Sequence, residues 1–128
     1  MYYQRQLAFG EAVERALKFN YCNFSGRAAR SEYWWVVLFS ALVSVAVSVA
    51  FFWSDTLEMI VSGLFSLYML LPMLGLGVRR LHDTGRSGWW LLIGFIPLVG
   101  QLILIYFMIL DSTPGVNQWG DVPNMVER

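Results

Sequence analysis

Three long runs without a charged residue constrain the fold more than any other feature of this chain. They extend from Tyr33 to Trp53, from Met59 to Val78 and from Gly88 to Leu110, and they contain 21, 20 and 23 residues. A bilayer core of about 30 Å requires about 20 apolar residues in a helix. Each run meets this length alone, so we predict an all-α membrane protein with about three transmembrane helices.

The composition favours membrane insertion over a soluble fold. Hydrophobic residues make up 57% of the 128 residues and charged residues only 14%, whereas soluble domains contain about 25% charged residues. Tyr33, Trp34 and Trp53 bracket the first run, and Trp89 and Trp90 open the third. Such rings prefer the level of the lipid headgroups. A chain of this length forms one domain, so residues 1–128 are read as a single integral membrane domain.

The basic residues indicate how the chain is oriented. Eight of the nine Lys and Arg residues lie before the first run or between the second and the third. The connection between the first two runs carries Asp55 and Glu58 and no base, and the tail 111–128 holds only Arg128. Basic segments stay in the cytoplasm during insertion. We therefore expect a multi-pass protein with a cytoplasmic N-terminus.

The third run leaves two topologies open, because Gly94, Pro97, Gly100 and Gln101 interrupt its middle. Proline breaks the hydrogen-bond ladder of a helix. The run could cross the membrane as one kinked helix, which would place the tail outside. It could also turn back as a re-entrant hairpin, which would return the tail to the cytoplasm. We favour the kinked crossing, because exposed irregular backbone is costly in lipid.

Residues 7–20 precede the spans and have the pattern of an amphipathic helix. At 100° per residue, apolar side chains from Phe9 to Phe19 share one face, and Glu11, Glu14 and Lys18 lie on the other. Such a helix can lie in the membrane interface. It can equally pack on the ends of the spans. Both interpretations place it next to the membrane.

Three motifs in the segments outside the spans carry a family resemblance. Before the first span the chain reads Gly26-Arg27-x-x-Arg30-Ser31-Glu32-Tyr33-Trp34, and before the third it reads Arg79-Arg80-Leu81-His82-Asp83-Thr84-Gly85-Arg86-Ser87-Gly88-Trp89-Trp90. The tail reads Thr113-Pro114-Gly115-x-Asn117-x-x-Gly120. From about Phe19 to Pro123 the chain resembles the bacterial DUF805 family. The resemblance implies a small bacterial inner-membrane protein and supplies no biochemical activity.

The charged residues of the first two motifs adjoin span ends, so we predict that they meet in one cytoplasmic cap. This candidate site comprises Arg27, Arg30, Glu32, Arg79, Arg80, His82, Asp83 and Arg86. It is either an ion-pair network that fixes the packing of the helices or a site for anionic lipid headgroups. In the second case each arginine gains about 1 kcal/mol from the negative inner leaflet.

The sequence offers no set of residues for catalysis. His82-Asp83 has no matched nucleophile and no second histidine, and the single cysteine, Cys22, excludes a Cys-based zinc site. We therefore expect no enzymatic activity, no cofactor or metal, and no nucleic-acid partner. Our leading hypothesis is a non-enzymatic component that binds membrane lipid or a protein partner through its cap and N-terminal helix. The alternative is a subunit of an oligomeric channel or transporter.

Polar and small residues within the spans point to helix association. Ser40, Ser44 and Ser48 recur on one face of the first span, which allows a second helix to approach closely. Gln101 is the most polar side chain within the runs, and we predict an interhelical hydrogen bond for it. The partner helix can belong to the same chain or to another, so a homo-oligomer or a membrane-protein partner is expected.

Overall fold

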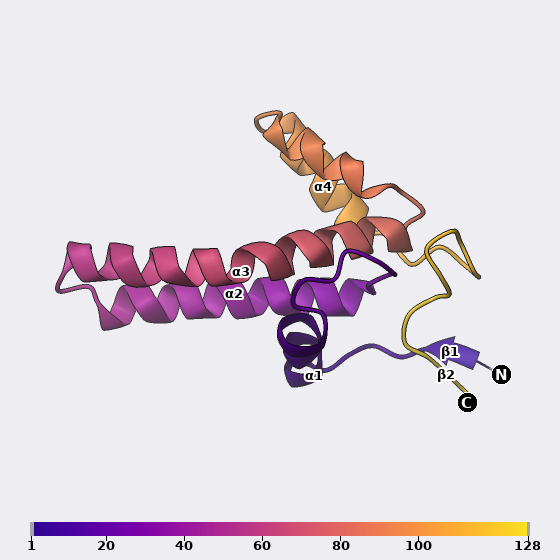
Figure 1. The fold of residues 1–128 in the computed structure, drawn as a ribbon, viewed down its shortest axis with the longest axis horizontal. Coiled ribbons are helices and arrows are strands. Elements are labelled where there is room, and N and C mark those ends of the chain that lie inside the picture. Colours follow the sequence, from indigo (N-terminus) through magenta and orange to yellow (C-terminus); the bar gives the residue numbers. More distant parts are fainter. Residues whose placement is uncertain (1, 128) are drawn as a thin grey trace.

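Two long antiparallel helices form the body of the protein in a computed structural model that describes residues 2–127 (Figure 1). Helix α2 extends over Arg30–Ala50 and helix α3 over Asp55–Asp83. They contain 21 and 29 residues, so at 1.5 Å per residue they are about 31 and 43 Å long. A short turn joins them, and the Ser54 side chain accepts a hydrogen bond from the Leu57 amide at the start of α3.

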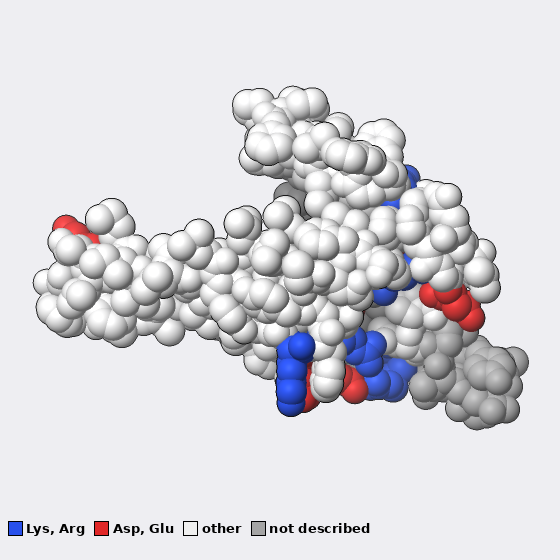
Figure 2. All heavy atoms as spheres, in the orientation of Figure 1, with Lys and Arg blue, Asp and Glu red and all other residues white. Residues whose placement is uncertain are grey.

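Both helices are long and apolar enough to cross a membrane, as the first two runs predicted. Most of their large apolar side chains are exposed, including Val45, Val49 and Leu67 at 61%, 67% and 70%. On the face that Figure 2 shows, charged atoms gather at one end of the pair, and acidic atoms mark the far tip. A surface of this kind matches a bilayer core rather than water. The predicted helical membrane fold is confirmed.

The third run forms a hairpin, so the favoured single kinked crossing is wrong. Its first half is a 3₁₀ helix, η2 (Gly88–Phe95), and its second half is helix α4 (Val99–Ile109). The limbs pack against each other in antiparallel fashion: the rings of Trp90 and Phe107 are 5.7 Å apart, and Gly94 faces Leu104. In Figure 1 the hairpin projects from the opposite side of the α2–α3 pair from α1.

The backbone at the tip of the hairpin explains the turn. Pro97 cannot donate a backbone hydrogen bond, and Leu98 adopts a positive φ of 63°. A Cβ atom on Gly100 would lie 1.7 Å from the Ile93 carbonyl oxygen, so only glycine permits this approach of the two limbs. The glycines and proline that suggested a kink therefore produce a reversal.

The predicted amphipathic helix is present and lies crosswise to the α2–α3 pair (Figure 1). It consists of α1 (Phe9–Glu14), continued by a π-helical turn, η1 (Arg15–Phe19). Its apolar face packs on α2, where the ring of Phe9 lies 5.6 Å from that of Trp35. Arg5 donates two hydrogen bonds to Glu11, and this pairing lowers the pKa of the Glu11 carboxyl group.

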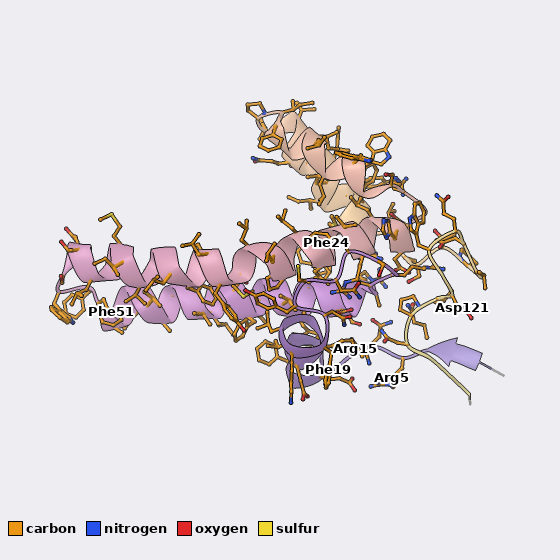
Figure 3. All side chains as sticks on the ribbon, viewed as in Figure 1. Arg5, Arg15, Phe19, Phe24, Phe51 and Asp121 are labelled. Atoms are coloured by element: carbon orange, nitrogen blue, oxygen red, sulfur yellow. The ribbon has the colours of Figure 1, made fainter. Side chains whose placement is uncertain are left out.

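Figure 3 shows Phe19 and Arg15 on the side of this helix away from the hairpin. Phe19 is 70% exposed, and Lys18 beside it is exposed as well. The helix thus contacts α2 with one face and leaves the Phe19 ring and the Lys18 ammonium group, which pairs with Glu14, exposed at its end. This arrangement combines both sequence interpretations, since the helix packs on a span and keeps groups that suit a membrane interface.

The segment 20–29 crosses α3 and is held there by two backbone contacts. Pro72 lies inside α3 and lacks the N–H that would bond the carbonyl of Tyr68, four residues earlier. The Tyr21 hydroxyl donates to that carbonyl over 2.8 Å. One turn further along, a Cβ on Gly75 would lie 2.7 Å from the Asn23 carbonyl oxygen. A core of buried apolar residues lies beneath this crossing: Ala16, Ala28, Val36, Met69 and Leu76.

The tail returns to the end of α3 instead of continuing beyond the far tip, which corrects the topology that a single crossing implied. The Thr113 amide donates to the Asp83 carbonyl over 2.7 Å. The chain then closes with an antiparallel pair of three-residue strands, β1 (Tyr2–Gln4) and β2 (Met125–Glu127). This small sheet was not predicted. Both termini lie at the end of the molecule where the three motifs meet (Figure 1).

Candidate functional site

The three sequence motifs converge on one cap at the end of α3, formed by residues 20–34, 79–90 and 111–123. Of the eight predicted site residues, Arg30 and Arg86 lie at its rim and the others are buried: Arg27, Glu32, Arg79, Arg80, His82 and Asp83. A tight turn follows α3, with Gly85 at a φ of 80°. The structure thus brings these eight residues to one end of α3.

Asp83 is the centre of the cap and is fully buried. One carboxylate oxygen accepts from Arg27 Nε over 3.0 Å. The other accepts from Arg80 Nη1 and from the Ser112 hydroxyl. A buried carboxylate is tolerated only when charged or polar partners replace its hydration. Asp83 thus joins the segment before α2, the end of α3 and the tail through one side chain.

Arg80 connects α3 to the hairpin by hydrogen bonds and is also fully buried. Its guanidinium donates to the carbonyls of Met108 and Leu110, at the C-terminal end of α4. The Trp34 indole donates to the Met108 carbonyl over 3.0 Å, and Arg30 donates to the Ile109 carbonyl over 3.1 Å. The last carbonyls of a helix have no partners within it and carry partial negative charge. These three side chains therefore cap α4.

The Arg27 guanidinium binds backbone carbonyls of the tail. It donates to the carbonyls of Thr113, Gly115 and Gly120 over 2.6, 2.8 and 3.1 Å. Gly115 and Gly120 take positive φ values of 72° and 125°, in the region that favours glycine. The turn between them is closed by paired backbone hydrogen bonds of Asn117 and Gly120. The glycines of the tail motif thus bend the chain so that its carbonyls face the guanidinium.

Arg79 and Glu32 form a separate buried ion pair between α3 and α2, with Nη1 and Oε1 3.2 Å apart. Arg79 Nε also donates to the Asn23 carbonyl. Its Nη2 is buried and has no hydrogen-bond partner among the described residues. Because Arg79 and Glu32 are only 3% and 2% exposed, this pair connects the two long helices beneath the segment 20–29.

His82 connects α3 to two segments through different atoms. Its Nδ1 lies 2.9 Å from the Gly26 carbonyl, which can only accept, so this nitrogen carries the proton. The ring stacks on Trp119 at a centroid distance of 4.5 Å and an interplanar angle of 4°. The Asn117 side chain donates to the His82 carbonyl over 2.9 Å. Sequence reasoning did not assign Ser112, Asn117 or Trp119 to the cap, although Asn117 is part of the tail motif.

The cap is largely neutralised from within. Arg27, Arg79 and Arg80 face Asp83 and Glu32, and backbone carbonyls of α4 and the tail supply further partial negative charge. These contacts are those of an ion-pair network. Arg30, whose side chain is 44% exposed, pairs with Asp111, and Arg86 covers the Phe107 ring at 4.1 Å. Among the described residues, no three His, Cys, Asp or Glu side chains group as a metal site would require.

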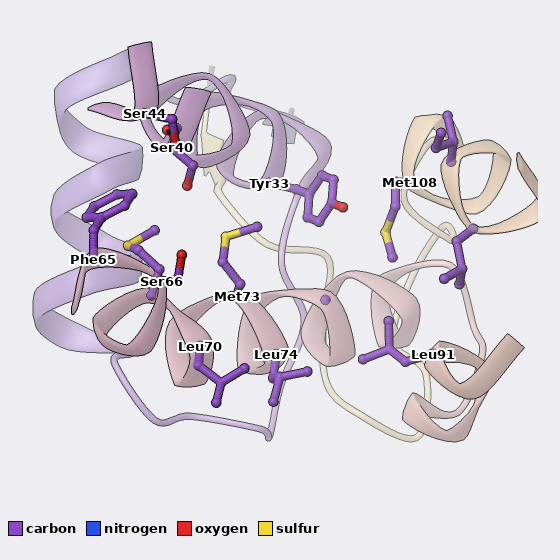
Figure 4. A pocket seen from close by; sticks show the side chains of 14 residues that line it. Tyr33, Ser40, Ser44, Phe65, Ser66, Leu70, Met73, Leu74, Leu91 and Met108 are labelled. Carbon is purple, nitrogen blue, oxygen red and sulfur yellow. Dashed lines mark hydrogen bonds between the residues drawn. The ribbon is translucent and has the colours of Figure 1, made fainter. Parts of the chain in front are cut away.

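Two apolar grooves flank the base of the hairpin. The inner groove, of about 440 Å³, lies between the hairpin and the α2–α3 pair, and Figure 4 shows Tyr33, Ser40, Ser44, Met73 and Met108 among its lining residues. The base groove, of about 520 Å³, lies between α3, the start of the hairpin and the segment 20–29. Its lining includes Phe24, Leu74, Val78, His82, Ser87 and Leu92. The base groove therefore adjoins the cap directly.

Comparison with known proteins places the chain in a family. The family model described as protein of unknown function (DUF805) matches residues 21–121 of the chain. Inner membrane protein YhaI of Escherichia coli K12 is 42% identical over 104 residues, which cover 81% of this chain and 88% of that protein. Inner membrane protein YhaH of the same organism is 36% identical over 110 residues, which cover 83% and 91%. No solved structure gives a significant match. The chain therefore belongs to the DUF805 family, whose E. coli relatives are inner membrane proteins.

Proposed function

We propose that this chain is a non-enzymatic component of the inner membrane that binds a phospholipid beside its cap. The cap and the N-terminal helix lie on the cytoplasmic side in this proposal. The distribution of charge supports the orientation, since eight of nine Lys and Arg residues lie in the segments that would then be cytoplasmic. Anionic lipids of the inner leaflet would gain from Lys18 and Arg30, whose side chains are 69% and 44% exposed.

The base groove is the observation that carries the proposal. Leu74, Val78 and His82 line it at positions i, i+4 and i+8 of α3, so they share one face along about 12 Å of the helix. Leu74 and Val78 belong to the second apolar run, whereas His82 belongs to the cap. The groove thus changes from apolar to polar along its length, as a phospholipid does, and its volume of about 520 Å³ is typical of ligand sites.

The polar end of the groove offers both a donor and an acceptor. His82 is 7% exposed, and because its Nδ1 is held by Gly26, its Nε2 is left to accept a hydrogen bond. The Ser87 oxygen accepts from the Trp89 amide, so its hydroxyl hydrogen is left to donate. A headgroup with a phosphate and a hydroxyl or ammonium group fits this pair. An acyl chain would then lie along Val78 and Leu74.

Photo-crosslinking tests the proposal. The purified protein in detergent is incubated with increasing amounts of phosphatidylglycerol that carries a diazirine in one acyl chain, and labelled peptides are mapped by mass spectrometry. We expect saturable labelling of peptides that contain Leu74, Val78 or Leu92. Leu92→Trp should fill the groove and reduce the labelling at least five-fold. Phe95→Trp is the matched control, because Phe95 lies on the same limb, is 83% exposed and does not line the groove.

The result that would overturn the proposal is labelling that does not saturate, or that Leu92→Trp leaves at the level of Phe95→Trp. Flux measurements on liposomes that contain the purified protein address the alternative of a channel or transporter subunit. Saturable or ion-selective flux would favour that alternative over a component that only binds lipid.

A further inference from the structure

Gln101 is the one feature of the hairpin that its contacts within the chain do not explain. It lies on α4, two residues after the helix begins at Val99, and it is exposed. Sequence reasoning predicted an interhelical hydrogen bond for it. Within residues 2–127 its carboxamide makes no hydrogen bond. The predicted bond is therefore not made within the described part of this chain.

The surroundings of Gln101 make an unpaired carboxamide unfavourable. The neighbouring side chains at the tip are apolar and exposed, with Leu98, Val99 and Leu102 at 68%, 58% and 57%. The limbs contain eight and eleven residues, so each is about 16 Å long, roughly half of a bilayer core of about 30 Å. A tip that enters the membrane to this depth has no water for the amide, and an amide without a partner there is strongly disfavoured.

Among the residues that the structure describes, no polar side chain meets this need. Ser40 and Ser44 lie in the inner groove (Figure 4), and the Ser44 hydroxyl donates to the Ser40 carbonyl. Gln101 does not line either groove. Its carboxamide is therefore left to bond a group other than the described residues of its own chain.

We infer that the hairpin is an interface between two copies of this chain, in which the two Gln101 carboxamides hydrogen-bond to each other. A carboxamide has both a donor and an acceptor, so it complements itself across a two-fold axis. Leu98 lies three residues before Gln101, and Ile105 and Ile109 lie four and eight residues after it, so these exposed side chains place an apolar stripe beside it. Interhelical bonds of glutamine are a recognised cause of helix association in membranes. This inference goes beyond the proposed lipid binding and uses none of its residues.

The dimer is tested by fluorescence energy transfer between labelled copies in liposomes over a range of protein-to-lipid ratios. Wild type should associate, and Gln101→Leu should weaken the association about 3- to 30-fold, as expected for the loss of an interhelical hydrogen bond. Gln101→Asn retains the amide and should restore part of the association. Since Gln101→Leu removes an exposed polar group, it does not threaten folding of the monomer.

Disulfide formation locates the contact independently. In a Cys22→Ser background, Gln101→Cys should form an intermolecular disulfide under mild oxidation. Phe95→Cys, on the other limb, is the control and should form at least five-fold less. The inference fails if wild type does not associate, if Gln101→Leu associates as wild type does, or if the two cysteine variants crosslink equally.

Discussion

At the scale of single residues, the cap shows buried arginines that work mainly as hydrogen-bond donors to backbone. Arg27 and Arg80 each pair with Asp83, and together they bind five carbonyls of the tail and of α4. A planar guanidinium can serve several acceptors at once, which the ammonium of lysine cannot do with the same geometry. These two positions therefore tolerate lysine poorly, although the charge would be kept.

The hydroxyl of Tyr21 also donates a hydrogen bond to a backbone carbonyl, that of Tyr68. The contribution of this bond to stability can be measured separately. Tyr21→Phe should lower the free energy of unfolding by about 1 kcal/mol, because the Tyr68 carbonyl loses its partner. In a Pro72→Ala background the same substitution should have almost no effect, since the alanine supplies the missing N–H. Thermal denaturation in detergent of the four proteins measures this coupling. Equal losses in both backgrounds would contradict the assignment.

Sequence reasoning identified the charged residues of the cap but not the backbone carbonyls that they bind. The motifs gave Arg27, Arg80 and Asp83 because charged residues beside apolar runs are conspicuous. Most of the partners of the arginines are backbone carbonyls. Every residue has a backbone carbonyl, so the sequence does not show which of them bind the arginines. The stacking of Trp119 on His82 was equally hidden, because it depends on the return of the tail.

At the scale of elements, the reversal of the third run decides the architecture. Its 23 uncharged residues are enough for one crossing, and length alone therefore predicted the wrong topology. The reversal depends on contacts of two glycines, and the sequence does not show which residues these glycines contact. Gly100 meets the Ile93 carbonyl and Gly94 meets Leu104, and both contacts exist only once the chain has turned back.

The hairpin should depend on Gly100 more than on other glycines in helices. Gly100→Ala should destabilise the protein by about 1–3 kcal/mol, because the added methyl group would overlap the backbone of the other limb. Gly63→Ala is the control, since no atom lies within 4 Å of a Cβ at Gly63, and it should stabilise α3 by up to about 1 kcal/mol. Denaturation midpoints compare the two, and opposite signs are expected.

At the scale of the whole molecule, the antiparallel pair α2–α3 and the hairpin of η2 and α4 each return the chain to the end where it began. The basic segments and the tail therefore lie at one end. The far tip carries Asp55 and Glu58, and the cap carries the arginines (Figure 2). This polarity follows from two long helices and a hairpin that returns. A third crossing would have separated Arg27 from the tail carbonyls that it binds.

Labelling of single cysteines tests this arrangement in cells. In a Cys22→Ser background, Thr56→Cys, Thr84→Cys and Gln118→Cys are treated separately with a membrane-impermeant thiol reagent. With the N-terminus in the cytoplasm, only the cysteine at position 56 should react in intact cells, and the other two should react after lysis. Reaction at position 118 in intact cells would mean that the tail lies outside.

The closure of the cap by the tail sets an order for biogenesis. Arg80 and Asp83 are synthesised 29 or more positions before Ser112, the first tail residue that Asp83 binds. Until the hairpin and the tail have been made, Arg80 lacks the α4 carbonyls and Asp83 lacks the Ser112 hydroxyl, so both groups remain hydrated at the membrane surface. The helices can therefore insert during translation, but the cap can assemble only after residue 120 has left the ribosome.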